Sequence, residues 1–329
     1  MASKLGSNSG SSIENVARAL LFEIMPIVFL EGFGRLNLAT SRLAWPKNPT
    51  VIFTSNHFYT DEIFKVWVAN KVSGGTKYVI GQHGNHYGSH RYKYPSVAEQ
   101  ISDAFITWGW CEDPKLHIPS FVFKTAGRRQ QRYNPQGQLL LAQSLIGHRS
   151  TTWDNFEEYD QHFSNQYKFL NGLATEPRRQ VIIRLHSWSS RLQWCDKSRW
   201  RDYDRSLQID DGVQKFSNLI SKCRLVVYTT DTTGIIELIN SSIPMLAFWD
   251  GGLDHLRESA KPFYSSLMDA EILFTCPHAA SAKVNSIWED PQLWWESDNV
   301  VAAREFFASN YARESNFPSY DLAKILSSF

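Results

Sequence analysis

At 329 residues the chain is longer than an ordinary domain with a single core, and we expect two domains of roughly 150 residues each. Hydrophobic residues make up 43% of the chain and aromatic residues 14%, which is enough to fill two cores and excludes a largely disordered protein. The 34 Lys and Arg nearly balance the 33 Asp and Glu, and a net charge of +1 argues against nucleic-acid binding through a phosphate backbone.

The first residues are rich in Ser and Gly and lack the basic and apolar regions of a signal peptide, so we predict a flexible leader over residues 1–12. The apolar segment 19–30 that follows contains Glu23 and Pro26 and is shorter than the ~20 residues that a bilayer span requires. We expect this segment to be a helix packed on the rest of the protein. An element lying on a membrane surface is the alternative.

The cysteines lie far apart in the chain and form no CxxC pair: Cys111, Cys195, Cys223 and Cys276. This spacing argues against a structural zinc site and against a disulfide framework. We therefore expect a protein of the reducing cytoplasm.

Short runs of β-branched and aromatic residues in the first half predict buried strands at residues 51–54, 77–80 and 104–107. Between the first two, apolar residues recur at helical spacing over residues 61–72, and acidic residues occupy the first turn of that helix. This order of elements predicts a βαβ unit.

The second half repeats the alternation of strands and helices. Strands are predicted at residues 181–185, 225–228, 245–248 and 272–274, and helices near 154–172, 211–222 and 233–241. The last thirty residues are typical of helices with a break at Pro318. A domain boundary is predicted within residues 125–138, where Gly, Pro and an Arg/Gln run interrupt the periodicity.

This alternation predicts an α/β protein with two Rossmann-like domains facing a central cleft. We place the N-terminal domain at residues 13–130, the C-terminal domain at 131–299 and C-terminal helices at 300–329. In open parallel sheets ligands bind at the carboxyl ends of the strands. Catalytic residues are therefore expected directly after strands.

After the first predicted strand the chain turns and begins a helix with two carboxylates, Asp61 and Glu62. Thr60 is the expected N-cap, and Lys65 lies one turn into the helix. A glycosyl transfer that retains configuration can use a carboxylate nucleophile, and we predict Asp61 first and Glu62 second for that role. The alternative is that both acids only complement the helix dipole.

The segment 81–92 follows the next predicted strand and combines three glycines with three histidines. Glycines let backbone amides approach a ligand, and histidine exchanges protons with hydroxyls near neutral pH. We assign His83 as general acid or base, a role that His86 also fits, and we place Gln82 and His86 beside the donor. The alternatives are a structural loop or a metal site made by His83, His86 and His90, although no fourth ligand stands beside them.

A third segment, residues 227–238, is a strand followed by a hydroxyl-rich turn and a helix start. Such a turn presents hydroxyl and N–H groups to a phosphate, and a carboxylate one turn later can accept hydrogen bonds from ribose. The predicted donor-binding residues here are Thr230, Asp231, Thr232, Thr233, Gly234 and Glu237. The alternative is a capped helix whose threonines only satisfy their own backbone.

A fourth polar group, Arg184 with His186, ends the strand at 181–185 and suits a phosphate or a carboxylate. A buried structural ion pair for Arg184 is an equal alternative. The Asp202-Tyr203-Asp204 sequence has the Asp-x-Asp pattern that holds a metal diphosphate, but it follows no predicted strand and arginines flank it. We predict a surface segment there.

Together these residues resemble a family of bacterial surface-carbohydrate transferases related to the retaining β-Kdo glycosyltransferases. The resemblance is carried by Phe53-Thr54-Ser55-Asn56 through Asp61-Glu62-Ile63-Phe64-Lys65, Gly81-Gln82-His83-Gly84 through Tyr87-Gly88, Thr107-Trp108-Gly109-Trp110 and Thr232-Thr233-Gly234-Ile235-Ile236-Glu237. It implies a GT-B fold in which the first domain holds the acceptor and the catalytic groups and the second holds the nucleotide sugar.

The resemblance also implies the donor CMP-β-Kdo and retention of configuration. CMP leaves as a nucleoside monophosphate, so no metal is required to hold a diphosphate, and we expect none. Kdo carries a carboxylate on its anomeric carbon, for which Arg184, Lys65 and Arg91 are the candidate cations.

The implied function is transfer to a glycan or glycolipid acceptor in the synthesis of a bacterial surface polysaccharide, such as the O-antigen of lipopolysaccharide or a capsule. The implied location is the cytoplasm, with peripheral contact to the inner membrane or to a synthase complex left open. The alternatives are a transferase that uses another nucleotide sugar and a non-catalytic nucleotide- or glycan-binding module of a larger synthase.

Overall fold

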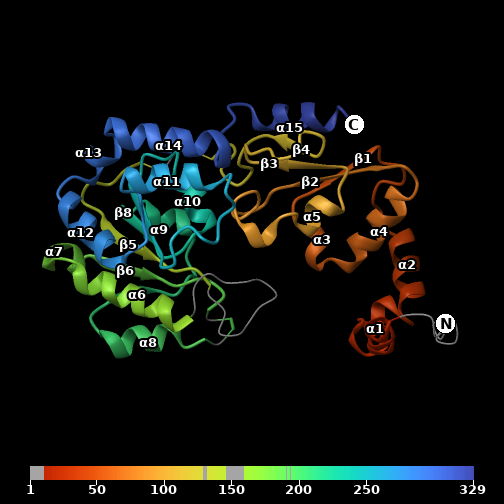
Figure 1. Cartoon of the computed structure of the whole chain (residues 1–329), viewed down its shortest axis with the longest axis horizontal. Coiled ribbons are helices and arrows are strands. Elements are labelled where there is room, and N and C mark those ends of the chain that lie inside the picture. Colours follow the sequence, from red (N-terminus) through yellow and green to blue (C-terminus); the bar gives the residue numbers. More distant parts are fainter. Residues whose placement is uncertain (1–10, 129–131, 146–158, 190, 193) are drawn as a thin grey trace. The chain divides into compact units, whose positions relative to one another are not determined.

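The computed structural model describes residues 11–128, 132–145, 159–189, 191–192 and 194–329 (Figure 1). Strands and helices alternate along this part of the chain, and every strand pair with a defined register is parallel. The α/β class predicted from the sequence is therefore confirmed.

The strands are β1 (Val51–Thr54), β2 (Lys77–Gly81), β3 (Ala104–Thr107), β4 (His117–Pro119), β5 (Gln138–Ala142), β6 (Val181–Arg184), β7 (Gln208–Asp210), β8 (Cys223–Tyr228), β9 (Met245–Phe248) and β10 (Leu273–Phe274). The α-helices are α1 (Ser12–Ile24), α2 (Phe33–Ser41), α3 (His57–Thr60), α4 (Glu62–Val72), α5 (Val97–Gln100), α6 (Tyr159–Gly172), α7 (Thr175–Arg179), α8 (Asp196–Tyr203), α9 (Phe216–Ile220), α10 (Thr233–Leu238), α11 (Lys261–Asp269), α12 (Pro277–Ile287), α13 (Pro291–Trp295), α14 (Asp298–Tyr311) and α15 (Pro318–Leu326). Short 3-10 helices in the described residues are η2 (Ile27–Phe29) and η3 (Arg91–Lys93).

The strands form two parallel sheets, in the orders β1-β2-β3-β4 and β10-β9-β8-β5-β6-β7. In the second sheet β5 is central, and Leu139 is opposite Val181 of β6 on one side and Leu225 of β8 on the other. Chain order runs outward from this centre in both directions, so the strand order reverses between β5 and β8. Such a switch point is where ligands bind in open parallel sheets.

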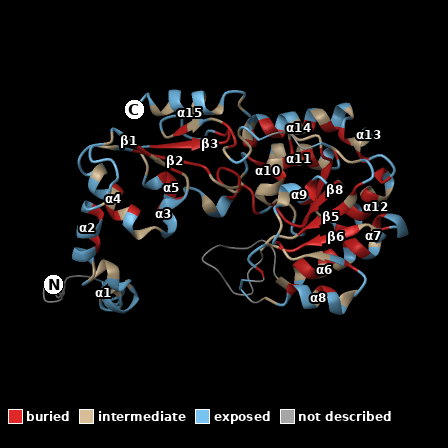
Figure 2. Ribbon diagram, turned by 180° about the vertical axis from the view of Figure 1, so that it is seen from behind, coloured by how far each residue is buried: buried red, intermediate tan, exposed pale blue. Residues whose placement is uncertain are grey.

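Both faces of the second sheet are buried, as the red strands β5, β6 and β8 in Figure 2 show. On one face Leu141, Ile183 and Val227 belong to a single hydrophobic core that also contains residues of α6, α8 and α12. Figure 1 shows α10, α11 and α14 on the other face. Burial on both faces explains why these strands are continuous apolar runs in the sequence.

All seven strands predicted from the sequence are present, three with the predicted ends and four with one end shifted by one or two residues. Three further strands were not predicted: the three-residue strands β4 and β7, and β5. The predicted helices correspond to α4, α6, α9 and α10, and α15 begins at Pro318, where the sequence predicts a break. Residues 154–158 of the predicted helix at 154–172 lie outside the described residues.

The chain divides into two compact units. The first ends at Ile80 and also includes Phe329, and the second runs from Gly81 to Ser328. The change from the first sheet to the second falls between β4 and β5, which overlaps the boundary region predicted at residues 125–138. The domain limits at residues 130 and 299 stay a prediction.

Helix α1 begins with a capping box, in which Glu14 N donates to Ser11 Oγ and Ser11 N donates to the Glu14 carboxylate. Residues 1–10 of the predicted leader lie outside the described residues. No residue of α1 is buried, and Ile24 is 74% exposed, so the expected packing of this helix on the protein is wrong. In the described part of the chain, no helix combines the length and the apolar character needed to cross a bilayer.

Candidate active site

Two of the predicted segments meet at the carboxyl end of β8. The backbone N–H of Asn85, in the loop after β2, donates to Thr233 Oγ1 at 3.0 Å. The side-chain Nδ2 of Asn85 donates to Asp231 Oδ1 at 2.6 Å. The Gln-His-Gly loop is thereby in direct contact with the Thr-rich turn at the switch point of the second sheet.

Asp231 is the buried centre of this contact. Its Oδ1 also accepts a hydrogen bond from the Tyr264 hydroxyl at 3.3 Å. Its Oδ2 faces His90 Nε2 at 2.9 Å and His255 Nε2 at 3.3 Å. Burial alone would raise the pKa of the Asp231 carboxyl, but hydrogen bonds from His255 and His90 hold that pKa well below its ordinary value. The carboxylate is therefore ionised at neutral pH.

A backbone bridge fixes the two histidines relative to each other. His90 and Leu256 form an isolated antiparallel bridge, and the N–H of Arg91 donates to the His255 carbonyl at 3.0 Å. The loop after β2 is thus tied to the loop after β9. Both imidazoles face the same carboxylate oxygen, and hydrogen bonds between their backbones hold them there. One nitrogen of each imidazole and one oxygen of Asp231 all lie within 4.8 Å of one another.

His86 packs against this cluster in an uncommon backbone conformation. Its φ of 83° lies in the left-handed region, which is uncommon for a non-glycine residue, and strained backbone of this kind tends to cluster at functional sites. Its ring stacks on His90 with 4.0 Å between centroids, and its Nε2 lies 3.2 Å from the Asp231 carbonyl oxygen. Burial, together with the nearby His90, lowers the pKa of His86 to about 3. Its imidazole is therefore neutral at physiological pH.

Gln82 explains why the Gln-His-Gly and Thr-Trp-Gly-Trp phrases occur together. Its side-chain oxygen accepts hydrogen bonds from Trp108 N at 3.0 Å and from Trp110 Nε1 at 2.8 Å. Its Nε2 donates to the Gly84 carbonyl at 2.9 Å. Gln82 therefore joins the loop after β2 to the loop after β3, and its predicted contact with a donor stays a prediction.

His83, the predicted acid or base, is half-buried, and its Nδ1 lies 3.4 Å from the Tyr87 hydroxyl. Gly88, expected to let a backbone amide approach a ligand, instead allows close packing. Its φ is 71°, and a Cβ there would lie 2.2 Å from the Trp110 ring.

The predicted nucleotide-binding turn lies at the start of α10. Thr230 is buried, and Thr232 is the N-cap residue of the helix. Gly234 is required by packing, because a Cβ there would lie 2.4 Å from the Tyr228 ring. Glu237 forms ion pairs with Lys124 at 2.6 Å and with Arg128 at 3.2 Å.

Arg184 is engaged by its own structural elements. One nitrogen pairs with Asp210, and Nη2 donates to the Gly212 carbonyl at 3.2 Å and the Gln214 carbonyl at 2.9 Å. This geometry agrees with the alternative given for Arg184 from the sequence, a buried structural ion pair. Burial, with the charge of Arg184, lowers the pKa of His186.

In the unit that ends at Ile80, Asp61 is the N-cap of α4 and its Oδ1 accepts from Phe64 N at 2.9 Å. The expectation that Thr60 caps this helix is wrong, because Thr60 ends α3. Lys65 Nζ donates to Glu62 Oε1 at 2.9 Å, while Glu62 Oε2 is buried and accepts no hydrogen bond from the described residues.

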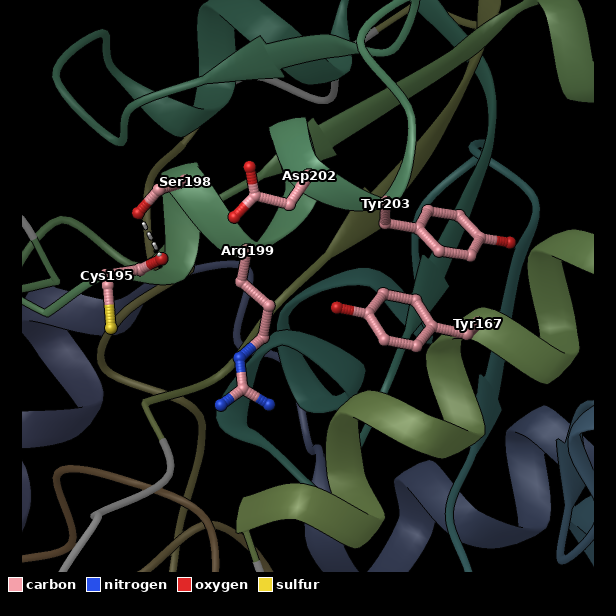
Figure 3. A pocket seen from close by; sticks show the side chains of 6 residues that line it. All are labelled: Tyr167, Cys195, Ser198, Arg199, Asp202 and Tyr203. Atoms are coloured by element: carbon pink, nitrogen blue, oxygen red, sulfur yellow. Dashed lines mark hydrogen bonds between the residues drawn. The ribbon is translucent and has the colours of Figure 1, made fainter.

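A shallow pocket of about 440 Å³ lies between α6 and α8 (Figure 3). It is lined by Tyr167, Cys195, Ser198, Arg199, Asp202 and Tyr203. The rings of Tyr167 and Tyr203 stack almost parallel, with 4.2 Å between centroids. None of the predicted site residues lines this pocket. Asp202 of the Asp-x-Asp pattern, which does line it, is exposed, as expected for a surface segment.

The sequence profile of the LIC12162 family of transferases matches residues 1–326. The chain belongs to this transferase family. No curated protein matches the sequence of this transferase.

Several solved structures are similar in fold to this transferase. A Listeria monocytogenes protein described as a UDP-N-acetylglucosamine 2-epimerase has 11% identity and a TM-score of 0.52, covering 90% of this chain and 77% of its own. S. aureus MnaA bound to UDP has 11% identity and a TM-score of 0.49, covering 91% and 78%. Acinetobacter baumannii MurG has 9% identity and a TM-score of 0.46, covering 92% and 79%. The first similarity, together with the two parallel sheets, confirms the predicted GT-B-like fold.

Several residues of the cluster around Asp231 were not predicted from the sequence. Asn85, which lies between His83 and His86, was not predicted as a site residue. His255 and Tyr264 follow β9 in a segment without a recognisable motif. Lys93, whose Nζ lies 3.5 Å from His86 Nδ1, was also missed. The Gln-His-Gly loop could have pointed to Asn85 and Lys93, whereas only the three-dimensional structure brings His255 and Tyr264 to Asp231.

Proposed function

We propose that this transferase moves a sugar from a nucleotide donor to a glycan or glycolipid acceptor in the synthesis of a bacterial surface polysaccharide, such as an O-antigen or a capsule. The observation that carries the proposal is the contact between the Gln-His-Gly loop and the Thr-rich turn at the switch point of the second sheet. A donor bound at these strand ends would meet imidazoles from one loop and hydroxyls from the other. Membership of a transferase family supports this interpretation.

For the donor we propose CMP-β-Kdo, transferred with retention of configuration. The support is the resemblance carried by the Gln-His-Gly and Thr-Trp-Gly-Trp phrases, which Gln82 holds together through hydrogen bonds to Trp108 and Trp110. Because CMP leaves as a monophosphate, the transfer itself needs no metal to hold a diphosphate. We place the reaction in the cytoplasm, with peripheral contact to the inner membrane through a glycolipid acceptor.

The nucleophile in this proposal is a carboxylate at the start of α4. Asp61 uses Oδ1 to cap the helix, which leaves Oδ2 for a ligand. Glu62 is held by Lys65 through Oε1, and its buried Oε2 is without a hydrogen-bond donor among the described residues. A buried carboxylate oxygen without a donor is costly unless a ligand completes it, so Glu62 becomes at least the equal of Asp61 for this role.

His83 is the proposed acid and base for the leaving group and the acceptor hydroxyl. The nucleotide would bind along Thr230, Asp231, Thr232, Thr233 and Gly234, with Glu237 accepting hydrogen bonds from ribose. Lys124 and Arg128 compensate the charge of Glu237 and hold it in place for that contact.

The structure favours one of the three candidate cations for the Kdo carboxylate. Arg184 donates to Asp210 and to two carbonyls, and Lys65 pairs with Glu62. Arg91 is exposed, follows His90 directly and stacks over the Tyr92 ring at 4.5 Å. We therefore favour Arg91, with His86 and His186 as neutral hydrogen-bonding groups beside the donor.

A transfer assay tests the proposal. The purified chain is incubated with CMP-Kdo and a set of bacterial glycan acceptors, and products are identified by mass spectrometry. Glu62→Gln, Asp61→Asn and His83→Ala are compared with Glu258→Gln, which removes an 87% exposed carboxylate paired with Lys261. We expect Kdo transfer by the wild type and by Glu258→Gln, a loss of about 10²–10⁴-fold in His83→Ala, and a larger loss in one of the two α4 variants.

Equal transfer by the wild type and all three site variants would remove these role assignments. Transfer from a UDP- or GDP-sugar but not from CMP-Kdo would replace the donor while keeping the reaction class. Binding of nucleotides without transfer, and without donor hydrolysis, would indicate a non-catalytic module of a larger synthase.

A further inference from the structure

We propose that His90, Asp231 and His255 bind a divalent transition-metal ion. This ion would not hold a diphosphate of the donor, a role that a CMP donor does not require. The three potential ligand atoms lie within 4.8 Å of one another, and all three residues are buried. This inference goes beyond the proposed transfer reaction and does not depend on the identity of the donor.

The distances suit a shared ion. Metal bonds of about 2.0–2.1 Å at near-tetrahedral angles separate two ligand atoms by about 3.3 Å. Asp231 Oδ2 lies 2.9 Å from His90 Nε2 and 3.3 Å from His255 Nε2. Both imidazoles therefore direct the nitrogen that would bind the ion toward the same carboxylate oxygen, and small side-chain rotations suffice to accommodate the ion.

The two oxygens of Asp231 divide between two kinds of partner. Oδ2 faces two imidazole nitrogens, those of His90 and His255, whereas Oδ1 accepts from Asn85 Nδ2 at 2.6 Å and from the Tyr264 hydroxyl at 3.3 Å. Metal-binding carboxylates are typically oriented in this way, with the second oxygen hydrogen-bonded to surrounding residues. In this proposal Oδ2 would bind the ion, and Oδ1 would hold the carboxylate in position.

The ligands come from three loops whose backbones are already joined. His90 pairs with Leu256 across an antiparallel bridge, next to His255, and Asn85 N donates to Thr233 Oγ1 beside Asp231. An ion at this position would lock the loop after β2, the turn after β8 and the loop after β9 to one another. Two imidazole nitrogens and one carboxylate oxygen suit zinc or iron(II) and do not suit calcium or magnesium.

The competing interpretation is that both imidazoles simply donate N–H hydrogen bonds to Asp231. A second buried pair in the same unit offers a matched comparison, because His117 Nε2 lies 3.0 Å from Glu99 Oε1. This pair lacks the second imidazole at the carboxylate. Removing His117 should therefore disturb packing without touching the proposed metal site.

The test is the metal content of the full chain, purified without a metal-affinity tag and measured by inductively coupled plasma mass spectrometry, before and after dialysis against zinc or, anaerobically, iron(II). We expect about one ion per wild-type chain, a loss in His90→Gln and His255→Gln, and retention in His117→Gln. A wild type that holds no ion after dialysis against either metal, or His90→Gln and His255→Gln variants that bind as much metal as the wild type, would overturn the proposal.

A second measurement keeps the proposal open to refutation if the variants do not fold. Dipicolinate should lower the melting temperature of the wild type, and added zinc or iron(II) should restore it. Cobalt(II) should give the intense visible d–d bands of a four-coordinate ion in the wild type, in place of the weak absorption of hydrated cobalt. An unchanged melting temperature together with the spectrum of hydrated cobalt would contradict the site, whatever the outcome of the transfer assay.

Discussion

Two buried carboxylates in the same unit, Glu99 and Asp231, are each paired with histidine but are built differently. Glu99 accepts from Ser96 N at 2.7 Å in the capping box of α5 and faces one imidazole, that of His117. Asp231 gathers partners from the loop after β2, the loop after β9 and α11. The first is mainly a local motif with one long-range contact, whereas the second joins segments that are distant in the chain.

The difference indicates which carboxylate is structural and which marks a site. His117 is itself oriented by structure, since its Nδ1 accepts from Glu112 N at 3.1 Å and from Asp113 N at 3.0 Å. Asp231 lies at the switch point of a parallel sheet, beside a strained histidine, where binding sites are found in such folds. Glu99 therefore stabilises one region, and Asp231 sets the geometry of the proposed site.

The largest contrast should appear when each carboxylate is removed. Asp231→Ala leaves two imidazoles, an amide and a phenol facing a cavity, and should lower the free energy of unfolding by about 3–5 kcal/mol. Glu99→Ala leaves one imidazole and one backbone N–H without their acceptor, and should cost about 1–3 kcal/mol. Chemical denaturation of both variants checks the order.

Equal losses in the two variants would break the comparison, because Asp231 would then be no more than a second local pair. Glu258→Gln serves again as the exposed control and should leave the free energy of unfolding within about 0.5 kcal/mol of the wild type.

A smaller effect should appear on acidification. Burial alone would raise the pKa of Glu99, but hydrogen bonds from His117 and Ser96 outweigh it and hold that pKa below its ordinary value. The stability contributed by the ionised carboxylate is therefore fully present above a pH of about 4.3 and is lost as the pH falls below that value. The gap in unfolding free energy between wild type and Glu99→Gln should shrink between about pH 5 and pH 3. A gap that is constant or widens in acid would contradict this assignment.

Much of the fold follows from local sequence pattern, and the exceptions have physical causes. Strands buried on both faces are apolar runs, so β3 and β9 were predicted with their observed ends. The ends of β1, whose residues are alternately half-buried and buried, were also predicted correctly. The Leu-Leu-Leu-Ala run of the central strand β5 is also buried, but it lacks β-branched residues. It follows an Asn-Pro turn, and the domain boundary was therefore predicted there. The strands β4 and β7 have three residues each, too few for a periodic signal.

The site was predictable only where chemistry and chain position coincide. The rule that ligands bind after strands led to the loop 81–92 and the turn after β8, which are in contact. The centre of the cluster depends on His255, which is 24 residues beyond Asp231 in a loop without a motif. Its position is set by the bridge between His90 and Leu256, a tertiary contact that no local pattern encodes.

The most direct test of the central claim, that the loop after β2 and the turn after β8 together form a nucleotide-sugar site, is a thermal-shift titration with CMP, UDP and GDP. We expect CMP to raise the melting temperature of the wild type, with a stabilisation of about 2.7 kcal/mol at 100 times the dissociation constant. Thr233→Val, which removes the hydroxyl that accepts from Asn85 N, should lose most of this shift, whereas Thr175→Val at the exposed start of α7 should keep it. A shift with UDP or GDP but none with CMP would contradict the proposed donor, and an unchanged CMP shift in Thr233→Val would contradict the site itself.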